Sequence, residues 1–177
     1  MTDERTLLER AKQYDKAALG ELYDRYAPRI YAYIYRRVGD VYLAEDLTGD
    51  VFVRVIQAIQ AEHSWRTSFQ AWLYRIAHNL VADHYRRQPP APELELDEQL
   101  MAIEDDPISA ATERLSQQSL CAIISRLTPD QQQVLALRFG AGMKAREVAE
   151  VMDKSVGAIE ALQHRALAAL RRVMKRE

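Results

Sequence analysis

Aromatic and arginine side chains occur together between Trp65 and Arg87. In a helix, this spacing turns Phe69 towards a core and leaves Arg75 and Asn79 on the opposite side. Rings can stack on unpaired bases while guanidinium groups hold phosphates, so the mixture favours binding to opened nucleic acid. The same pattern also fits a helix whose aromatic residues only pack in a core or cover a surface. The sequence leaves both interpretations open.

A second candidate for nucleic-acid binding covers residues 146–162, where the pattern indicates a helix-turn-helix. Ala149 is small where the second helix must cross closely, and Val148, Met152, Val156, Ile159 and Leu162 are apolar where the helices should pack. Ser155 can cap the second helix, whose first turns would then read base edges in a major groove. The alternative is a helical hairpin whose basic C-terminal end is favoured by the helix dipole.

The sequence offers little for catalysis or metal binding. Its four histidines lack metal-ligand spacing, since His78 and His84 are six residues apart rather than four. Asp83 next to His84 is an isolated pair, and Cys121 is the only cysteine. No nucleophile–base pair or phosphate-binding loop appears, so an enzyme is the least expected class. We expect no metal and no cofactor.

An acidic cluster comprises Glu45, Asp46 and Asp50. These carboxylates could stabilise the first turn of their helix through its dipole. They could equally form a docking patch for a basic partner.

Helical periodicity runs through both ends of the chain and predicts an all-α fold. Asp15 is a predicted N-cap, and Pro28 should kink or break the helix that follows it. Three apolar stripes are expected to form the first core, the last of them on the helix that follows Trp65. Their residues are Leu19, Leu22, Tyr23, Tyr26, Ile30 and Ile34; Leu43, Leu47, Val51 and Val55, widened by Phe52, Ile56 and Ile59; and Phe69, Trp72, Leu73, Ile76 and Leu80.

Towards the C-terminus, Thr128 followed by Pro129 and Gln131 predicts a helix start, and Gly140 its end. A preceding helix should carry Leu120, Ile123, Ile124 and Leu127. Two further helices are expected over residues 144–152 and 155–175, with a tight turn at 153–154.

Charge divides the chain into three parts. Residues 1–88 hold 13 Lys and Arg against 12 Asp and Glu, residues 89–113 hold 0 against 8, and residues 114–177 hold 11 against 6. Pro89, Pro90, Pro92 and Pro107 lie in or beside the acidic middle part. We therefore expect two small helical domains, 1–88 and 114–177, joined by a flexible acidic linker at 89–113 that repulsion and proline keep extended. Such charge asymmetry favours a protein that binds nucleic acid.

The N-terminal residues are charged and lack the apolar core of a signal peptide, and no apolar run approaches the ~18 residues of a membrane span. We expect a cytoplasmic protein without membrane insertion.

Four motifs occur in an order that resembles the extracytoplasmic-function sigma factors of bacterial RNA polymerase. They are AEDLTGDVF at 44–52, FQAWLYRIAHNLVADHYRR at 69–87, LTPDQQQVLALRF at 127–139 and the helix-turn-helix that follows. The resemblance spans nearly the whole chain apart from the linker. It implies two helical domains that bind core RNA polymerase and promoter DNA, with no small-molecule substrate, no cofactor and no catalysis. It also implies control by an anti-sigma factor.

The resemblance assigns roles to individual residues. Polymerase docking falls on Asp46, Leu47, Asp50 and Phe52. Melting and binding of the −10 promoter element fall on Trp65, Phe69, Trp72, Arg75, Asn79, Asp83, Arg86 and Arg87. Recognition of the −35 element falls on Ser155, Ala158, Glu160, Ala161, His164 and Arg165.

Two departures from the family pattern concern binding. Gly49 stands where the family usually has glutamine, which removes a docking contact and weakens the helix by about 1 kcal/mol relative to alanine. Glu160, Ala161 and Leu162 replace the usual lysine, serine and arginine, so the usual −35 preference is not expected to carry over unchanged.

Two other classes remain as alternatives. A stand-alone helix-turn-helix repressor that binds DNA as a dimer would explain only the C-terminal half. A helical adaptor that binds proteins alone would fit the net charge of −2.

Overall fold

A computed structural model describes residues 3–61, 68–87 and 123–174. Every regular element in these ranges is helical, which confirms the predicted all-α class. The chain divides into two compact units, Met1–Glu95 and Leu96–Glu177. This boundary falls inside the segment 89–113 predicted as a linker, and that segment lies outside the described residues.

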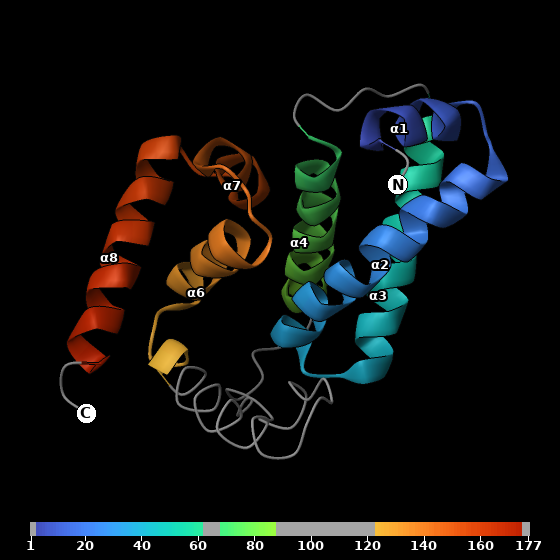
Figure 1. The fold of residues 1–177 in the computed structure, drawn as a ribbon. Coiled ribbons are helices and arrows are strands. Elements are labelled where there is room, and N and C mark those ends of the chain that lie inside the picture. Colours follow the sequence, from blue (N-terminus) through green and yellow to red (C-terminus); the bar gives the residue numbers. More distant parts are fainter. Residues whose placement is uncertain (1–2, 62–67, 88–122, 175–177) are drawn as a thin grey trace, which may run out of the picture. The chain divides into compact units, whose positions relative to one another are not determined.

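The described part of the first unit contains four helices, α1 (Glu4–Lys12), α2 (Lys16–Val38), α3 (Val41–Gln60) and α4 (Phe69–Arg87) (Figure 1). Helices α2, α3 and α4 pack against one another in pairs, and α1 lies against α2 and α3. The sequence pattern does not predict α1. The apolar pattern of this helix is short, because only Leu7 and Ala11, one turn apart, are buried among charged neighbours.

Asp15 joins α1 to α2. Its carboxylate accepts hydrogen bonds from the backbone N–H groups of Ala17 and Ala18, which confirms the predicted N-cap. Arg10 of α1 donates to the other carboxylate oxygen at 2.8 Å. That hydrogen bond, followed by those from the backbone, lowers the pKa of Asp15. A single side chain thus starts α2 and fixes the end of α1.

Pro28 does not break α2, which runs without interruption from Lys16 to Val38. Of the two expected outcomes, a kink or a break, the break was wrong. Proline removes one helical hydrogen bond, and its ring crowds the preceding turn. Pro28 is exposed, so water can solvate the carbonyl that loses its partner. Buried side chains on the opposite side of α2, such as Ile30 and Ile34, hold the helix together across this position.

The first core largely follows the three predicted stripes. The fully buried side chains include Leu22, Ile30, Ile34, Val51, Phe69 and Leu73. Two stripe positions differ, since Tyr23 is 49% and Ile56 is 41% exposed. Tyr74, which directly precedes the exposed Arg75, is buried and meets Tyr33 of α2 edge to face. Burial raises the pKa of Tyr74.

The second unit contains α6 (Pro129–Leu135), the π-helical turn η2 (Ala136–Gly140), α7 (Ala145–Met152) and α8 (Val156–Met174) (Figure 1). Thr128 and Gln131 form the predicted capping box, with Pro129 in the first turn. The helix ends at Gly140 as predicted, but its last turn is π-helical.

The core of the second unit packs the two helices of the helix-turn-helix against each other and against the residues before them. Leu127 and Leu135 pack around the fully buried Ala166 of α8. Val148, Met152 and Ile159 are buried between α7 and α8, as the pattern predicted. Val156 is 39% exposed, because it opens α8 on the outward side of the turn. Of the predicted preceding helix, the described part is a short helical end at 123–124, and Leu120 lies outside the described residues.

Candidate nucleic-acid interface

Helix α4 presents a polar face made by Arg75, Asn79 and Arg86, all exposed. Their spacing of four and seven residues places them on one side of the helix. Arg87 is exposed close by, and Asp83 forms an ion pair with Arg86. An exposed pair of this kind contributes little to stability, so Arg86 can exchange its carboxylate for a phosphate at small cost.

The aromatic residues of this segment divide between core and surface. Phe69 is 1% exposed and packs edge to face on Tyr26 of α2, with ring centroids 5.4 Å apart. Trp72 is half-buried beside Phe69, and Tyr85 is 44% exposed. Trp65 lies outside the described residues. Phe69 therefore positions α4 from inside the core, while Trp72 and Tyr85 reach the surface.

A polar cluster that sequence reasoning missed ties α4 to the end of α2. Arg37 donates to the hydroxyl of Tyr33 at 3.0 Å and lies 3.4 Å from Nδ1 of His78 on α4. The hydroxyl of Tyr85 donates to the backbone carbonyl of Arg37. Arg37 is 41 residues from His78 and 48 from Tyr85 along the chain, so no local spacing could have revealed the link between the two helices. Through them, Arg37 brings a positive charge to the border of the α4 face.

The start of α8 is open to the outside. The hydroxyl of Ser155 accepts from the N–H of Ala158 at 3.2 Å, which makes Ser155 the cap of this helix. Five of the residues predicted to read DNA are exposed here: Ser155, Glu160, Ala161, His164 and Arg165. The sixth, Ala158, is half-buried. Only Ile159 turns fully into the core over this stretch. A capped helix with an outward first turn has the form required to enter a major groove.

A tight turn and three side-chain contacts fix α8 within its unit. Asp153 adopts a left-handed conformation, with φ of 52°, that makes the predicted tight turn, and Lys154 pairs with Asp130 at 3.2 Å. Arg138 of η2 donates to Gln163 of α8 at 2.8 Å and to the carbonyl of Met143 at 2.6 Å. Arg138 had not been predicted to have a role.

On α3, Asp46 and Asp50 are exposed, whereas Leu47 and Phe52 are buried. The helix begins at Val41, and no acid lies in its first turn. The effect of a helix dipole falls off within the first turn. The dipole interpretation of this cluster therefore loses its basis, and the docking patch stays a prediction.

Gly49 is exposed in the middle of α3, and a Cβ atom added there would meet nothing within 4 Å. We expect Gly49→Ala to raise the free energy of unfolding by about 1 kcal/mol, because alanine loses less backbone freedom in a helix. Chemical denaturation followed by circular dichroism measures this. Gly39→Ala is the contrasting variant, since its φ of 67° strains any other residue and should lower stability. Equal effects of both changes would contradict this account.

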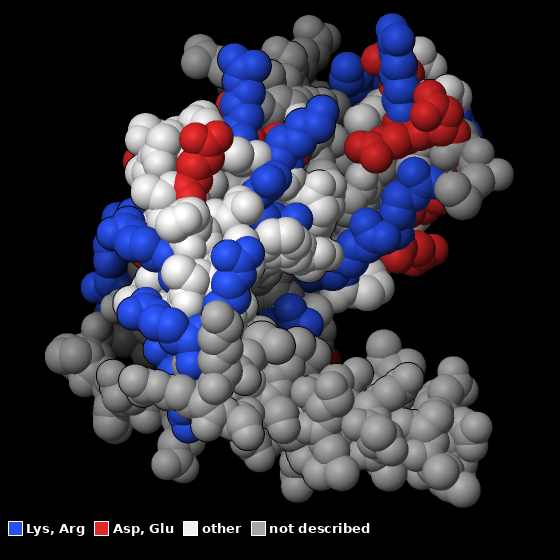
Figure 2. All heavy atoms as spheres, turned by 60° about the vertical axis from the view of Figure 1, so that its left-hand side comes forward, with Lys and Arg blue, Asp and Glu red and all other residues white. Residues whose placement is uncertain are grey.

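In the view of Figure 2, Lys and Arg side chains are spread over the described surface rather than gathered at one point. The exposed basic residues of the described chain include Arg75, Arg86 and Arg87 on α4, and Arg165, Arg171 and Arg172 on α8. Both candidate binding helices thus carry charge that attracts phosphate.

Models of two parts of one protein family match the two units. Sigma-70 region 2 matches residues 22–89, and Sigma-70 region 4 matches residues 123–172. The two matches together identify the chain as a sigma factor. The chain belongs to the extracytoplasmic-function sigma factors of the sigma-70 family, the proteins that direct RNA polymerase to promoters.

Curated relatives agree with this assignment. The ECF RNA polymerase sigma factor BldN of Streptomyces coelicolor is 41% identical over 95% of this chain, which spans 64% of BldN. The ECF RNA polymerase sigma factor SigD of Mycobacterium tuberculosis is 31% identical over 89% of this chain and 77% of SigD. The sigma factor RpoE of Bartonella quintana, solved with the anti-sigma factor NepR, shares the fold with a TM-score of 0.65. It is 17% identical over 88% of this chain and 96% of RpoE.

The region 2 match removes the reason for considering a stand-alone helix-turn-helix repressor, because such a protein would not need the first unit. Sigma factors as a class are not catalytic enzymes. In the part of the chain that the structure describes, no group of His, Cys, Asp and Glu could hold a metal ion. No helix among the described residues is long and apolar enough to cross a membrane.

Proposed function

We propose that this chain binds core RNA polymerase through α3 and promoter DNA through α4 and α8. The docking contacts come from Asp46 and Asp50, which are exposed beyond the first turn of α3. Leu47 and Phe52 act from the core beneath them, where Phe52 meets Tyr23 with ring centroids 4.8 Å apart. The chain itself performs no catalysis and works beside the polymerase in the cytoplasm.

The −10 element is melted by the face of α4. Arg75, Asn79, Arg86 and Arg87 contact the opened strand, with Asp83 holding Arg86 until DNA arrives. Trp72 contributes ring surface for stacking, and Trp65, outside the described residues, acts as a wedge. Phe69 serves this face indirectly by anchoring the start of α4 in the core.

The −35 element is read by the first turns of α8. Ser155, Ala158, Glu160, Ala161, His164 and Arg165 face the groove, and Arg171 and Arg172 add attraction to phosphate. The predicted domains, 1–88 and 114–177, would act on the two elements together. The acidic linker at 89–113, outside the described residues, would tether them and pass through the polymerase.

The observation that carries this proposal is the occurrence, in one chain, of an exposed arginine and asparagine face on α4 and an outward, capped helix start on α8. Run-off transcription with core polymerase, with and without the protein, tests it on promoters from the source genome. The expected result is new transcript that depends on both protein and core enzyme. If no such promoter yields added transcript, the proposal fails.

Glu160 should limit the affinity for the −35 element. Its carboxylate is exposed near the start of the groove-reading helix, where it repels phosphates. We expect Glu160→Lys to strengthen holoenzyme binding to promoter DNA several-fold and across different −35 sequences. Filter binding at two salt concentrations measures this. Weaker binding, confined to sites with a particular cytosine, would show instead that Glu160 accepts a hydrogen bond from that base.

We also propose that an anti-sigma factor controls the chain. The solved complex of the Bartonella quintana sigma factor with the anti-sigma factor NepR supports this for the shared fold. An inhibitor that covers the exposed acids of α3 would block polymerase docking. Co-purification of the protein with neighbouring gene products from its source tests this idea.

A further inference from the structure

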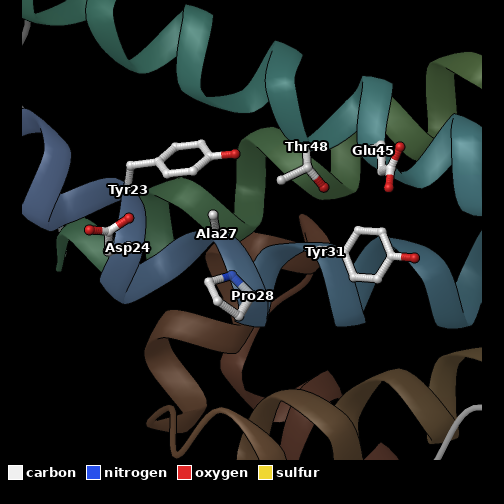
Figure 3. Close-up of a pocket in the computed structure, with 7 residues that line it drawn as sticks. All are labelled: Tyr23, Asp24, Ala27, Pro28, Tyr31, Glu45 and Thr48. Carbon is white, nitrogen blue, oxygen red and sulfur yellow. The ribbon is translucent and has the colours of Figure 1, made fainter.

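A notch lies between α2 and α3, with a volume of about 360 Å³. Seven residues line it: Tyr23, Asp24, Ala27, Pro28, Tyr31, Glu45 and Thr48. Figure 3 shows the carboxylate of Asp24 near one end and that of Glu45 near the other, with the Tyr23 hydroxyl directed between them. The notch belongs wholly to the first unit.

The lining is negative and carries no positive charge to balance it. Both Asp24 and Glu45 are exposed. Within the described residues, neither carboxylate takes part in an ion pair. The neighbouring Arg25 is already paired with Glu21 at 3.0 Å. A cation entering the notch would therefore meet a carboxylate at either end without displacing a resident partner.

The backbone adds a further acceptor. Proline has no N–H, so Pro28 cannot make the usual helical hydrogen bond to the carbonyl of Asp24 four residues earlier. The Asp24 carbonyl oxygen is therefore left without its usual helical donor. The hydroxyl of Thr48 donates to the carbonyl of Ala44 at 2.6 Å, so towards the notch it can only accept.

Two tyrosine rings form the rest of the walls. Tyr23 is held edge-on by Phe52, and Tyr31 stacks on Tyr35 with ring centroids 5.9 Å apart. Burial, and then the charge of Glu45, raise the pKa of Tyr31, which keeps its hydroxyl neutral. Aromatic rings beside carboxylates suit a planar cation, which can contact a ring face and donate at its edges.

We propose that this notch receives an arginine side chain from the partner that docks on α3. Arginine offers five N–H donors in a fixed plane, which matches a site rich in separated acceptors better than the single point charge of lysine. The notch continues the proposed docking surface, because Glu45 directly precedes Asp46 on α3. The inference rests on the proposed function in taking that partner to be core RNA polymerase.

The test is the affinity of full-length, fluorescently labelled protein for core RNA polymerase, measured by anisotropy. Asp24→Asn and Glu45→Gln should each weaken binding about tenfold, the effect of losing a hydrogen bond to a charged group. Glu9→Gln is the matched control, because Glu9 is equally an exposed acid of the same unit but lies on α1. It should leave the affinity unchanged.

Pro28→Ala separates binding from folding. Alanine restores the missing N–H, so the melting temperature should rise while polymerase binding weakens several-fold. A purely structural role for Pro28 predicts no loss of affinity.

Wild-type affinity in the Asp24→Asn/Glu45→Gln double variant would overturn the notch proposal, as would an equal loss in Glu9→Gln. The Asp46→Arg variant distinguishes a failure of the notch proposal from a failure of the proposed docking on α3. If Asp46→Arg abolishes binding while the double variant binds normally, docking on α3 stands and the notch is not used.

Discussion

Replacing Asp46 with arginine is expected to abolish binding to core RNA polymerase while the first unit still folds. Asp46 is exposed, and the buried residues of α3 lie on its other side. A docking partner complementary to this acidic surface would meet a like charge, which costs several kcal/mol at an interface. The affinity should therefore fall at least about a hundredfold. Anisotropy with labelled protein and core enzyme measures the change.

The matched control is Glu9→Arg, which makes the same charge reversal on α1. Glu9 has only an exposed ion pair with Lys12, at 3.4 Å, to lose. Binding close to that of the wild type is expected for this variant. Circular dichroism should give the same helical content for both proteins. If Asp46→Arg folds and retains its affinity, the acids of α3 do not dock the polymerase.

The second large effect is on stability. Phe69→Ala should lower the free energy of unfolding of the first unit by about 3–5 kcal/mol, the usual cost of emptying a buried aromatic site. Phe69 is 1% exposed, and the variant loses its contacts with both Tyr26 and Trp72. Thermal unfolding of the full chain, followed by circular dichroism, measures the loss.

Arg75→Ala provides the opposite pattern on the same helix. Arg75 is exposed, so its removal should change stability by no more than about 0.5 kcal/mol. It should nevertheless reduce promoter opening, measured by permanganate footprinting of the −10 region. If Phe69→Ala is as stable as the wild type but fails to open DNA, Phe69 contacts DNA directly rather than supporting α4 from the core.

Local signals explain which parts of the fold could be predicted. The cap at Asp15 and the capping box of Thr128 and Gln131 act over two or three residues, so they are visible in the sequence. The turn at Asp153 is equally local. Helix α1 escaped prediction because its apolar stripe is little more than one turn long. The π turn at 136–140 has no local marker, since its sequence also fits an α-helix.

The candidate site divides in the same way. Arg75 and Asn79 could be placed outside because the apolar residues of α4 define the opposite side. The burial of Tyr74 could not be predicted, because a tyrosine suits either a core or a surface. Its burial depends on Tyr33 of α2, which is distant in the sequence. The notch needs two helices, so no pattern within one of them would reveal it.

Helix α8 is held in its unit by Ile159 and Ala166, both fully buried, while residues 160, 161, 164 and 165 between them face outward. Substitutions at the outward positions therefore carry little penalty in folding. After a gene duplication, one copy can drift through many side chains at these four positions and remain a folded protein throughout. New promoter preferences can arise in this way by single steps, without compensating changes in the core. The unusual residues Glu160 and Ala161 occupy two of these outward positions, where the fold of α8 does not depend on the side chain.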